Sequence, residues 1–174
     1  MFKKVIRWIL GIVLFSIIGI IAFYFYPEKE LPKDTSIDSI VVYKSKKRLY
    51  AYADGKLIKT YKISLGRNPI GKKVYEGDNK TPEGIYIIND KNPNSGFYKN
   101  LGISYPNNED IENAKNLGKP TGGDVKIHGI KNGLGFFDKF HYWFSTRGCI
   151  RVTNKEIDEL YYAVKIGTTI DIQP

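Results

Sequence analysis

The chain has 174 residues and a single cysteine, Cys149, which excludes an intramolecular disulfide. It carries 27 Lys and Arg against 18 Asp and Glu, a formal net charge of +9. The lysines are scattered instead of lining one helix, so the charge does not indicate nucleic acid as a partner. An excess of this kind suits anionic wall polymers or lipid headgroups, and it equally suits a solvated lysine-rich surface.

The N-terminal segment predicts a membrane anchor. A basic stub at residues 1–7 precedes a run from Trp8 to Tyr26 that contains no charged residue. As a helix this run would span roughly 28 Å, enough for the hydrocarbon core of a bilayer. Because basic flanks stay in the cytoplasm, we expect a single-pass signal-anchor at 8–26 with the remainder of the chain exported.

Two other interpretations of this segment stay open. A cleaved signal peptide would have a shorter apolar core and small residues at its cleavage site, whereas this run ends in AFYFYPEKE. A soluble protein with a hydrophobic N-terminal helix is the other alternative. In either case a charged, proline-containing tether follows at 27–36, and residues 37–174 form one domain long enough to bury its own core.

Short strands dominate this domain. Asp54-Gly55 between two alternating segments predicts a hairpin, with Leu49 and Ala51 on one face of its first strand. Strands are expected at 39–45, 47–53, 57–66, 84–90, 100–105, 124–130, 148–152 and 168–172, with loops at 66–82 and 89–95. The predicted fold is mostly β, a sandwich or partial barrel with one or two minor helices.

Two helices are expected between the strands. The first opens at Asn108 and ends near Gly118. The second opens with a capping box, Thr153 and Glu156, followed by apolar residues at helical spacing. Gly167 is predicted to end this second helix at the C′ position.

The lone cysteine is the first candidate for chemistry. In an exported protein it is either buried and inert, bonded to another chain or a working thiol. A thiol is a poor nucleophile until a base or a positive field favours the thiolate. His128 lies in a predicted strand that can pair with the strand of Cys149, although a hydrogen-bonded strand histidine is the alternative. His141 stands among aromatic residues, a pattern typical of packing.

The residues around the cysteine suit acyl transfer. Gly129 and Gly148, one after the histidine and one before the cysteine, let backbone approach backbone. The turn that starts at Thr146 offers successive N–H groups as an oxyanion hole. Arg147 or Arg151 would favour the thiolate and bind a substrate carboxylate.

At these residues the sequence resembles the L,D-transpeptidase catalytic domain, also called the YkuD domain. His128-Gly129 and the later T-x-G-C-I-R from Thr146 are similar to the family's histidine and its Ser/Thr-His-Gly-Cys-hydrophobic-Asn/Arg motif. TPEGIYII from Thr81, RLYAYADGKLIKTYKISLG and CIRVTNKEIDELY resemble further family segments, so the similarity covers nearly all of 37–174. Arg147 stands where the family usually has a histidine. This difference concerns the preferred donor or acceptor more than the reaction itself.

The resemblance implies a cysteine-dependent L,D-transpeptidase at the bacterial cell membrane, with its catalytic domain on the extracytoplasmic side, in the periplasm or outside. Cys149 would attack a donor tetrapeptide of peptidoglycan, and His128 would act as general acid and base. The carbonyl of Gly129 would orient the imidazole. The amides of Arg147, Gly148 and Cys149 would hold the oxyanion, Thr146 would shape their turn, and Arg151 would face the substrate. An acceptor amine would complete a 3–3 cross-link or attach a wall protein, with no metal or other cofactor.

Three alternatives remain from the sequence. A hydrolase of the same family, an L,D-carboxypeptidase or a linkage-cleaving enzyme, would share the acyl-enzyme. A non-catalytic peptidoglycan-binding domain would keep the fold without turnover. A sortase also combines an anchor with Cys, His and Arg, but its arginine lies on the strand after the cysteine, whereas Arg151 follows Cys149 by two positions.

Overall fold

The computed structural model describes residues 2–26, 30–32 and 34–174. The chain forms two compact units, Met1–Glu30 and Leu31–Pro174. The first unit holds α1 (Phe2–Phe25), in which no residue is buried. α1 is long and apolar enough to cross a membrane, and a signal sequence can be equally long and apolar. Residues 27–29 and 33 of the predicted tether lie outside the described residues.

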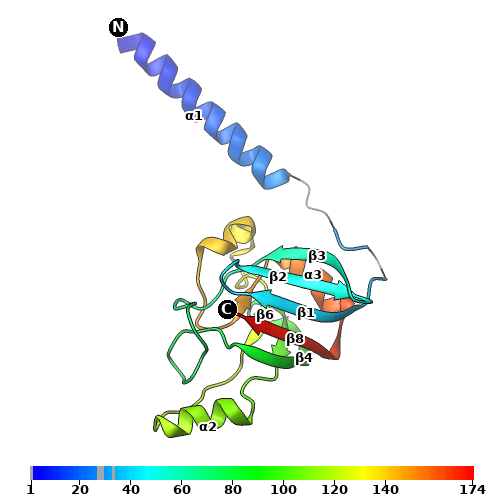
Figure 1. The fold of residues 1–174 in the computed structure, drawn as a ribbon. Helices are drawn as coiled ribbons and strands as arrows, with labels where there is room; N and C mark the ends of the chain where they lie inside the picture. Colours follow the sequence, from blue (N-terminus) through cyan, green and yellow to red (C-terminus); the bar gives the residue numbers. More distant parts are fainter. Residues whose placement is uncertain (1, 27–29, 33) are drawn as a thin grey trace. The chain divides into compact units, whose positions relative to one another are not determined.

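An eight-stranded sheet dominates the second unit, in the order β3-β2-β1-β8-β4-β5-β6-β7 (Figure 1). Its strands are β1 (Ile37–Tyr43), β2 (Arg48–Ala53), β3 (Lys56–Lys62), β4 (Gly84–Ser95), β5 (Tyr98–Ile103), β6 (Lys126–His128), β7 (Ile150–Arg151) and β8 (Val164–Gln173). Neighbours are antiparallel except for the pairs β1–β8 and β6–β7. The prediction of a mostly β domain is confirmed.

The two outer strands of this sheet approach each other beyond the end of β3. Ser64 and Arg151 exchange backbone hydrogen bonds of 3.0 and 2.9 Å, and Gly66 pairs with Thr146. The sheet therefore curls into a partial barrel, with the segment that follows β3 closing against β7. This closure fixes the backbone on both sides of Cys149.

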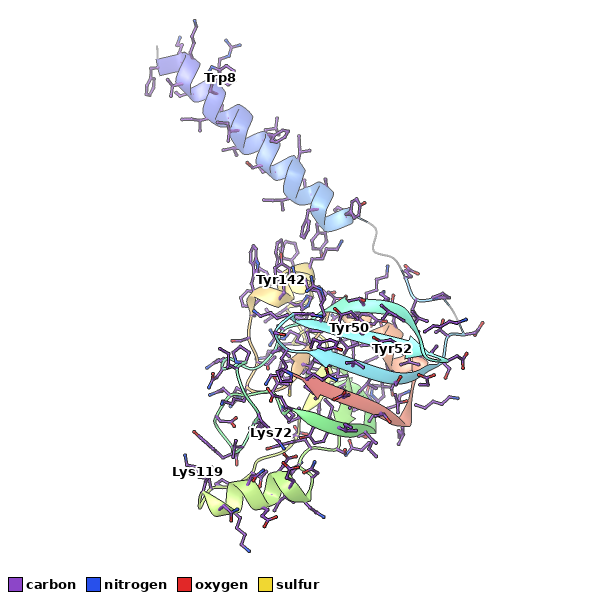
Figure 2. All side chains as sticks on the ribbon, in the orientation of Figure 1. Trp8, Tyr50, Tyr52, Lys72, Lys119 and Tyr142 are labelled. Atoms are coloured by element: carbon purple, nitrogen blue, oxygen red, sulfur yellow. The ribbon has the colours of Figure 1, made fainter. Side chains whose placement is uncertain are left out.

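Alternating burial separates the core from the surface. Leu49 and Ala51 on β2 are fully buried, while Tyr50 and Tyr52 lie on the other face of the strand (Figure 2). The core also contains Leu101, Ile127, Ile150, Ile157, Leu160 and Ile170. Its apolar side chains come from all parts of the sheet, so one continuous core supports the strands that carry the site.

Three further helices complete the second unit: α2 (Asn108–Asn116), the 3₁₀ helix η1 (Gly135–Trp143) and α3 (Asn154–Ala163). Both predicted α-helices are confirmed, and α3 packs against β5, β6 and β8. Thr153 caps α3 as predicted, because its hydroxyl accepts from the Glu156 amide at 3.1 Å and the Glu156 carboxylate accepts from the Thr153 amide at 2.8 Å. This capping box fixes the chain immediately after β7.

Local patterns also gave two wrong predictions. Gly167 does not end α3, since the helix stops at Ala163 and Val164 is already extended. With φ of +94°, Gly167 lies in β8, where the register with β1 shifts. Residues 89–95 are not a loop, because β4 continues to Ser95. There, pairing with β5 prevails over a sequence rich in Asn and Pro.

Candidate active site

A cavity of about 750 Å³ lies where β5, β6 and β7 meet the loop that follows β3. Its walls come from residues between 67 and 79, 92 and 100, 122 and 128, and 145 and 151. Of the predicted site residues, His128, Thr146, Arg147, Gly148, Cys149 and Arg151 line it. Gly129 and His141 are not part of this wall. The cavity therefore brings together most of the residues that the motifs indicated.

The pairing of β6 with β7 brings the histidine and the cysteine to the same cavity. The strands are parallel, with Ile127 opposite Ile150 and His128 opposite Arg151. Cys149, one residue before β7, consequently lies beside the start of β6. Its Sγ is 3.7 Å from the carbonyl oxygen of Asp124. The predicted pairing of these two strands is confirmed.

His128 is buried and held in one tautomer. Its Nδ1 lies 2.7 Å from the carbonyl oxygen of Gly129. Because a carbonyl only accepts, Nδ1 carries the proton and Nε2 keeps its lone pair. Burial lowers the pKa of His128 to about 4, more than the bond to Gly129 raises it, and Arg151 and Lys126 lower the pKa further. At neutral pH the imidazole is therefore uncharged and able to accept a proton.

The thiol of Cys149 is protonated in this environment. Burial raises the pKa of Cys149 above its usual value, although a hydrogen bond from the Lys126 backbone and the charge of Arg151 act in the opposite direction. The charge of Arg151 lowers the pKa of Cys149, but burial raises this pKa by more. Thiol and imidazole are both neutral, so a reaction here needs proton transfer during attack rather than a pre-formed ion pair.

The turn before the cysteine is closed by a threonine. The Thr146 hydroxyl donates to the Cys149 carbonyl at 2.7 Å and accepts from the Gly148 amide at 3.1 Å. The Gly148 amide is thus occupied, whereas among the described residues no acceptor is found for the amide of Cys149. Gly148 has φ of +141°, and a Cβ there would lie 2.8 Å from the Lys80 carbonyl oxygen. Only glycine fits this position without displacement.

Strand register reveals a polar row that sequence reasoning missed. Asn100 pairs with His128, His128 with Arg151 and Arg151 with Ser64, so the four side chains share one face. Asn100 Oδ1, Arg151 Nε and Ser64 Oγ are buried and, among the described residues, lack a hydrogen-bond partner. Asn100 also lines the cavity. Nothing in the sequence NLGISY distinguishes this asparagine, because only the register places it beside the histidine.

His141 has a structural place instead. It is buried, with Nδ1 3.0 Å from the Asp138 carbonyl oxygen and Nε2 2.9 Å from the Lys62 carbonyl oxygen. Burial lowers the pKa of His141. These contacts attach η1 to the end of β3, and they do not bring the ring to the cavity wall. His141 itself is packed as predicted, whereas Trp143 and Phe144 of the same segment are exposed, so the prediction of a packed aromatic segment is wrong for them.

The cavity is basic. Its wall carries the basic residues Arg67, Lys73, Lys126, Arg147 and Arg151 and the acidic residues Glu76 and Asp124. Lys73 is paired with Asp78 and Lys126 with Asp124, at 2.9 and 2.6 Å. The three arginines have no carboxylate partner in the part of the chain that the structure describes. No group of three or more His, Cys, Asp or Glu there is arranged to hold a metal ion.

A curled sheet with a cysteine and a neutral histidine at one basic cavity has the parts of a thiol-dependent acyl-transfer site. The sequence model of the L,D-transpeptidase catalytic domain (YkuD) matches residues 37–172. The chain belongs to this family, as its motifs predicted, which removes the sortase alternative.

Relatives agree with this assignment. A protein of Escherichia coli K12 named provisionally as L,D-transpeptidase YafK is 31% identical over 120 residues, which cover 68% of this chain and 41% of the relative. The crystal structure of the helical cell shape determining protein Pgp2 (K307A mutant) from Campylobacter jejuni is 31% identical with a TM-score of 0.59, and the match covers 80% of this chain and 47% of that one. The chain therefore spans less than half the length of either relative.

A more distant structure supports the fold alone. An L,D-transpeptidase from Xylanimonas cellulosilytica is 17% identical with a TM-score of 0.51, over 83% of this chain and 64% of that one. The partial barrel is thus similar to the fold of this family well beyond the range of close sequence similarity.

Proposed function

We propose that the chain is a cysteine-dependent L,D-transpeptidase that acts on peptidoglycan stem peptides through an acyl-enzyme on Cys149. One observation carries the proposal: the parallel pairing of β6 and β7 brings Cys149 and a buried, neutral His128 to one cavity. The tautomer of His128, set by the Gly129 carbonyl, leaves Nε2 as the base.

In the first half-reaction, Nε2 of His128 takes the proton of the Cys149 thiol while Sγ bonds to the carbonyl carbon between the third and fourth residues of a donor tetrapeptide. The carbonyl oxygen becomes an oxyanion, and the amide of Cys149, for which no acceptor is found among the described residues, donates to it. The amide of Arg147 is a second candidate donor, whereas that of Gly148 already donates to Thr146. Gly148 and Thr146 then act by shaping the turn.

The intermediate collapses when the carbon–nitrogen bond breaks and His128 returns its proton to the departing D-amino acid. The product is a thioester on Cys149. An amine of a second stem peptide then attacks the thioester, its proton passes through His128 to the sulfur, and a 3–3 cross-link forms. An amine of a wall protein is an alternative acceptor.

The basic cavity supports an anionic substrate. Arg67, Arg147 and Arg151 present positive charge that no described carboxylate neutralises. Stem peptides carry carboxylates, which guanidinium groups bind bidentately. Asn100 adds a side-chain amide on the histidine's side of the cavity wall.

The second candidate within the family is a hydrolase, in which water replaces the acceptor amine and releases a tripeptide. It needs the same two residues and the same acyl-enzyme. A non-catalytic peptidoglycan-binding domain would need neither residue. The exposed apolar surface of α1 supports location at the membrane, with the cytoplasmic stub at 1–7, the anchor at 8–26, the tether at 27–36 and the catalytic domain at 37–174 outside the cytoplasm.

Product analysis separates the candidates. The full chain, reconstituted in detergent, is mixed with purified disaccharide-tetrapeptide beside the Cys149→Ala variant, and the products are resolved by mass spectrometry. Cross-linked dimers with loss of the terminal D-residue are expected from the wild type alone. Tripeptide without dimers would indicate the hydrolase. Equal binding by both proteins with no product from either would overturn the enzymatic proposal in favour of the binding domain.

A further inference from the structure

A group of large apolar side chains is exposed at η1 and directly after it. We call Phe136, Phe137, Trp143 and Phe144 the aromatic lip; their exposed fractions are 73, 46, 69 and 52%. Figure 2 shows Tyr142 among the side chains that project from this helix. None of the four lines the cavity. Contact with a substrate held in the cavity therefore does not explain their exposure.

Exposure of so much aromatic surface is costly in water. Burying such a side chain is favourable, and contiguous apolar patches on soluble domains usually mark a site of interaction. Phe and Trp are side chains typical of proteins that lie in the interface between headgroups and acyl chains. The lip thus has the composition of an interfacial segment.

The charge around the lip favours an anionic surface. Residues 131–147 contain Lys131, Lys139 and Arg147 and a single acidic residue, Asp138. From β3, Lys62 places its Nζ 3.3 Å from the ring centre of Tyr142. Aromatic side chains bordered by lysine and arginine match a bilayer that contains anionic lipids, because each basic group near such a surface is attracted to it.

The tether between α1 and the domain is short enough to keep the domain close to a bilayer. If α1 spans the membrane, as proposed above, the tether at 27–36 extends over at most about 35 Å before β1 begins. A domain on so short a connection meets the membrane surface at high local concentration, so even a weak interfacial contact is populated.

From these observations we propose that the aromatic lip docks on the anionic outer surface of the membrane to which α1 anchors the chain. The lip is also joined to the candidate site, because Arg151 Nη1 donates to the Phe144 carbonyl at 3.1 Å and His141 ties η1 to β3. Docking through the lip therefore sets how the cavity faces the membrane. The inference rests on the proposed membrane location.

The two tryptophans of the chain, Trp8 and Trp143, allow a direct test. The full chain is reconstituted in vesicles of phosphatidylcholine and phosphatidylglycerol, with or without bromine on the acyl chains, which quenches tryptophan over short distances. In Trp8→Phe, Trp143 is the only tryptophan, so excitation selective for tryptophan reports on this residue. We expect brominated lipid to reduce this emission about twofold, as for a ring in the interface, and the reduction to weaken in vesicles without phosphatidylglycerol.

Two control variants make the result interpretable. Trp143→Phe leaves Trp8, whose quenching reports insertion of α1. Trp8→Phe/Trp143→Phe/Tyr162→Trp moves the only tryptophan to α3, where Tyr162 is 75% exposed, and is expected to stay unquenched. If brominated lipid quenches Trp143 no more than it quenches the tryptophan of this α3 control, the inference is wrong. It is also wrong if soluble tetrapeptide, but not lipid, shifts the emission of Trp143.

The experiments distinguish failure of membrane docking from failure of the membrane anchor and from failure of catalysis. Unquenched Trp8 would remove the membrane anchor, and with it the docking. Quenched Trp8 with unquenched Trp143 would remove docking alone. The product assay on tetrapeptide tests catalysis independently of both.

Discussion

The state of His128 gives the sharpest test of the site. Its pKa near 4, against about 6.5 for a free imidazole, follows mainly from burial. At pH 5 about ten molecules in eleven would hold His128 neutral, whereas an unperturbed histidine would be almost fully protonated. The lowered pKa also means that stability is lost as the pH falls from 6.5 towards 4, because only the unfolded chain gains the proton. The loss is about 3 kcal/mol in all, from a difference of roughly 2.5 pKa units.

The chain has only two histidines, so nuclear magnetic resonance of histidine-labelled protein without an affinity tag reads both rings directly. His141→Gln assigns the two sets of signals. We expect His128 to keep the chemical shifts of the Nδ1-protonated neutral tautomer from pH 7 down to pH 5, with a midpoint near 4. A midpoint near 6.5, or the other neutral tautomer, would refute the reasoning that burial and the Gly129 carbonyl set the base.

Two further predictions concern the cavity wall. Gly148→Ala forces a Cβ against a backbone carbonyl at positive φ, so we expect a loss of roughly 1–3 kcal/mol in the free energy of unfolding together with most of the activity. Gly133→Ala, also at positive φ but with no atom near its Cβ, should cost less in urea unfolding; equal costs would contradict the close contact. Asn100→Leu removes an unpaired buried acceptor, so we expect unchanged or higher stability with a raised KM for tetrapeptide. An unchanged KM would show that Asn100 does not bind the substrate.

Local chemistry allowed much of the fold to be predicted. The Asp54-Gly55 turn, with φ of +49° and +71°, and the Thr153 capping box depend on neighbours in sequence, and both are where the patterns placed them. The extension of β4 and the place of Gly167 in β8 depend on pairing with distant strands. Such pairing prevails over local preference and is not visible in a single segment.

The candidate site likewise combines features that depend on neighbours in sequence with features that depend on distant strands. Residue type and spacing made Cys149 and His128 candidates, and the fold brings both to one cavity. Asn100 and the barrel closure at Ser64 could not be predicted, since only strand register places them beside the histidine and the arginine. The dominance of burial over Arg151 in setting the Cys149 pKa also required the folded environment.

The most direct test of the central claim is the covalent intermediate. The full chain is mixed with disaccharide-tetrapeptide, quenched in acid within the first turnover and analysed by intact-mass and peptide-mapping mass spectrometry. We expect a tripeptide-acyl adduct on Cys149, absent in Cys149→Ala and formed much more slowly in His128→Gln. Products released without any adduct on Cys149, or an adduct that forms equally fast in His128→Gln, would contradict the central claim.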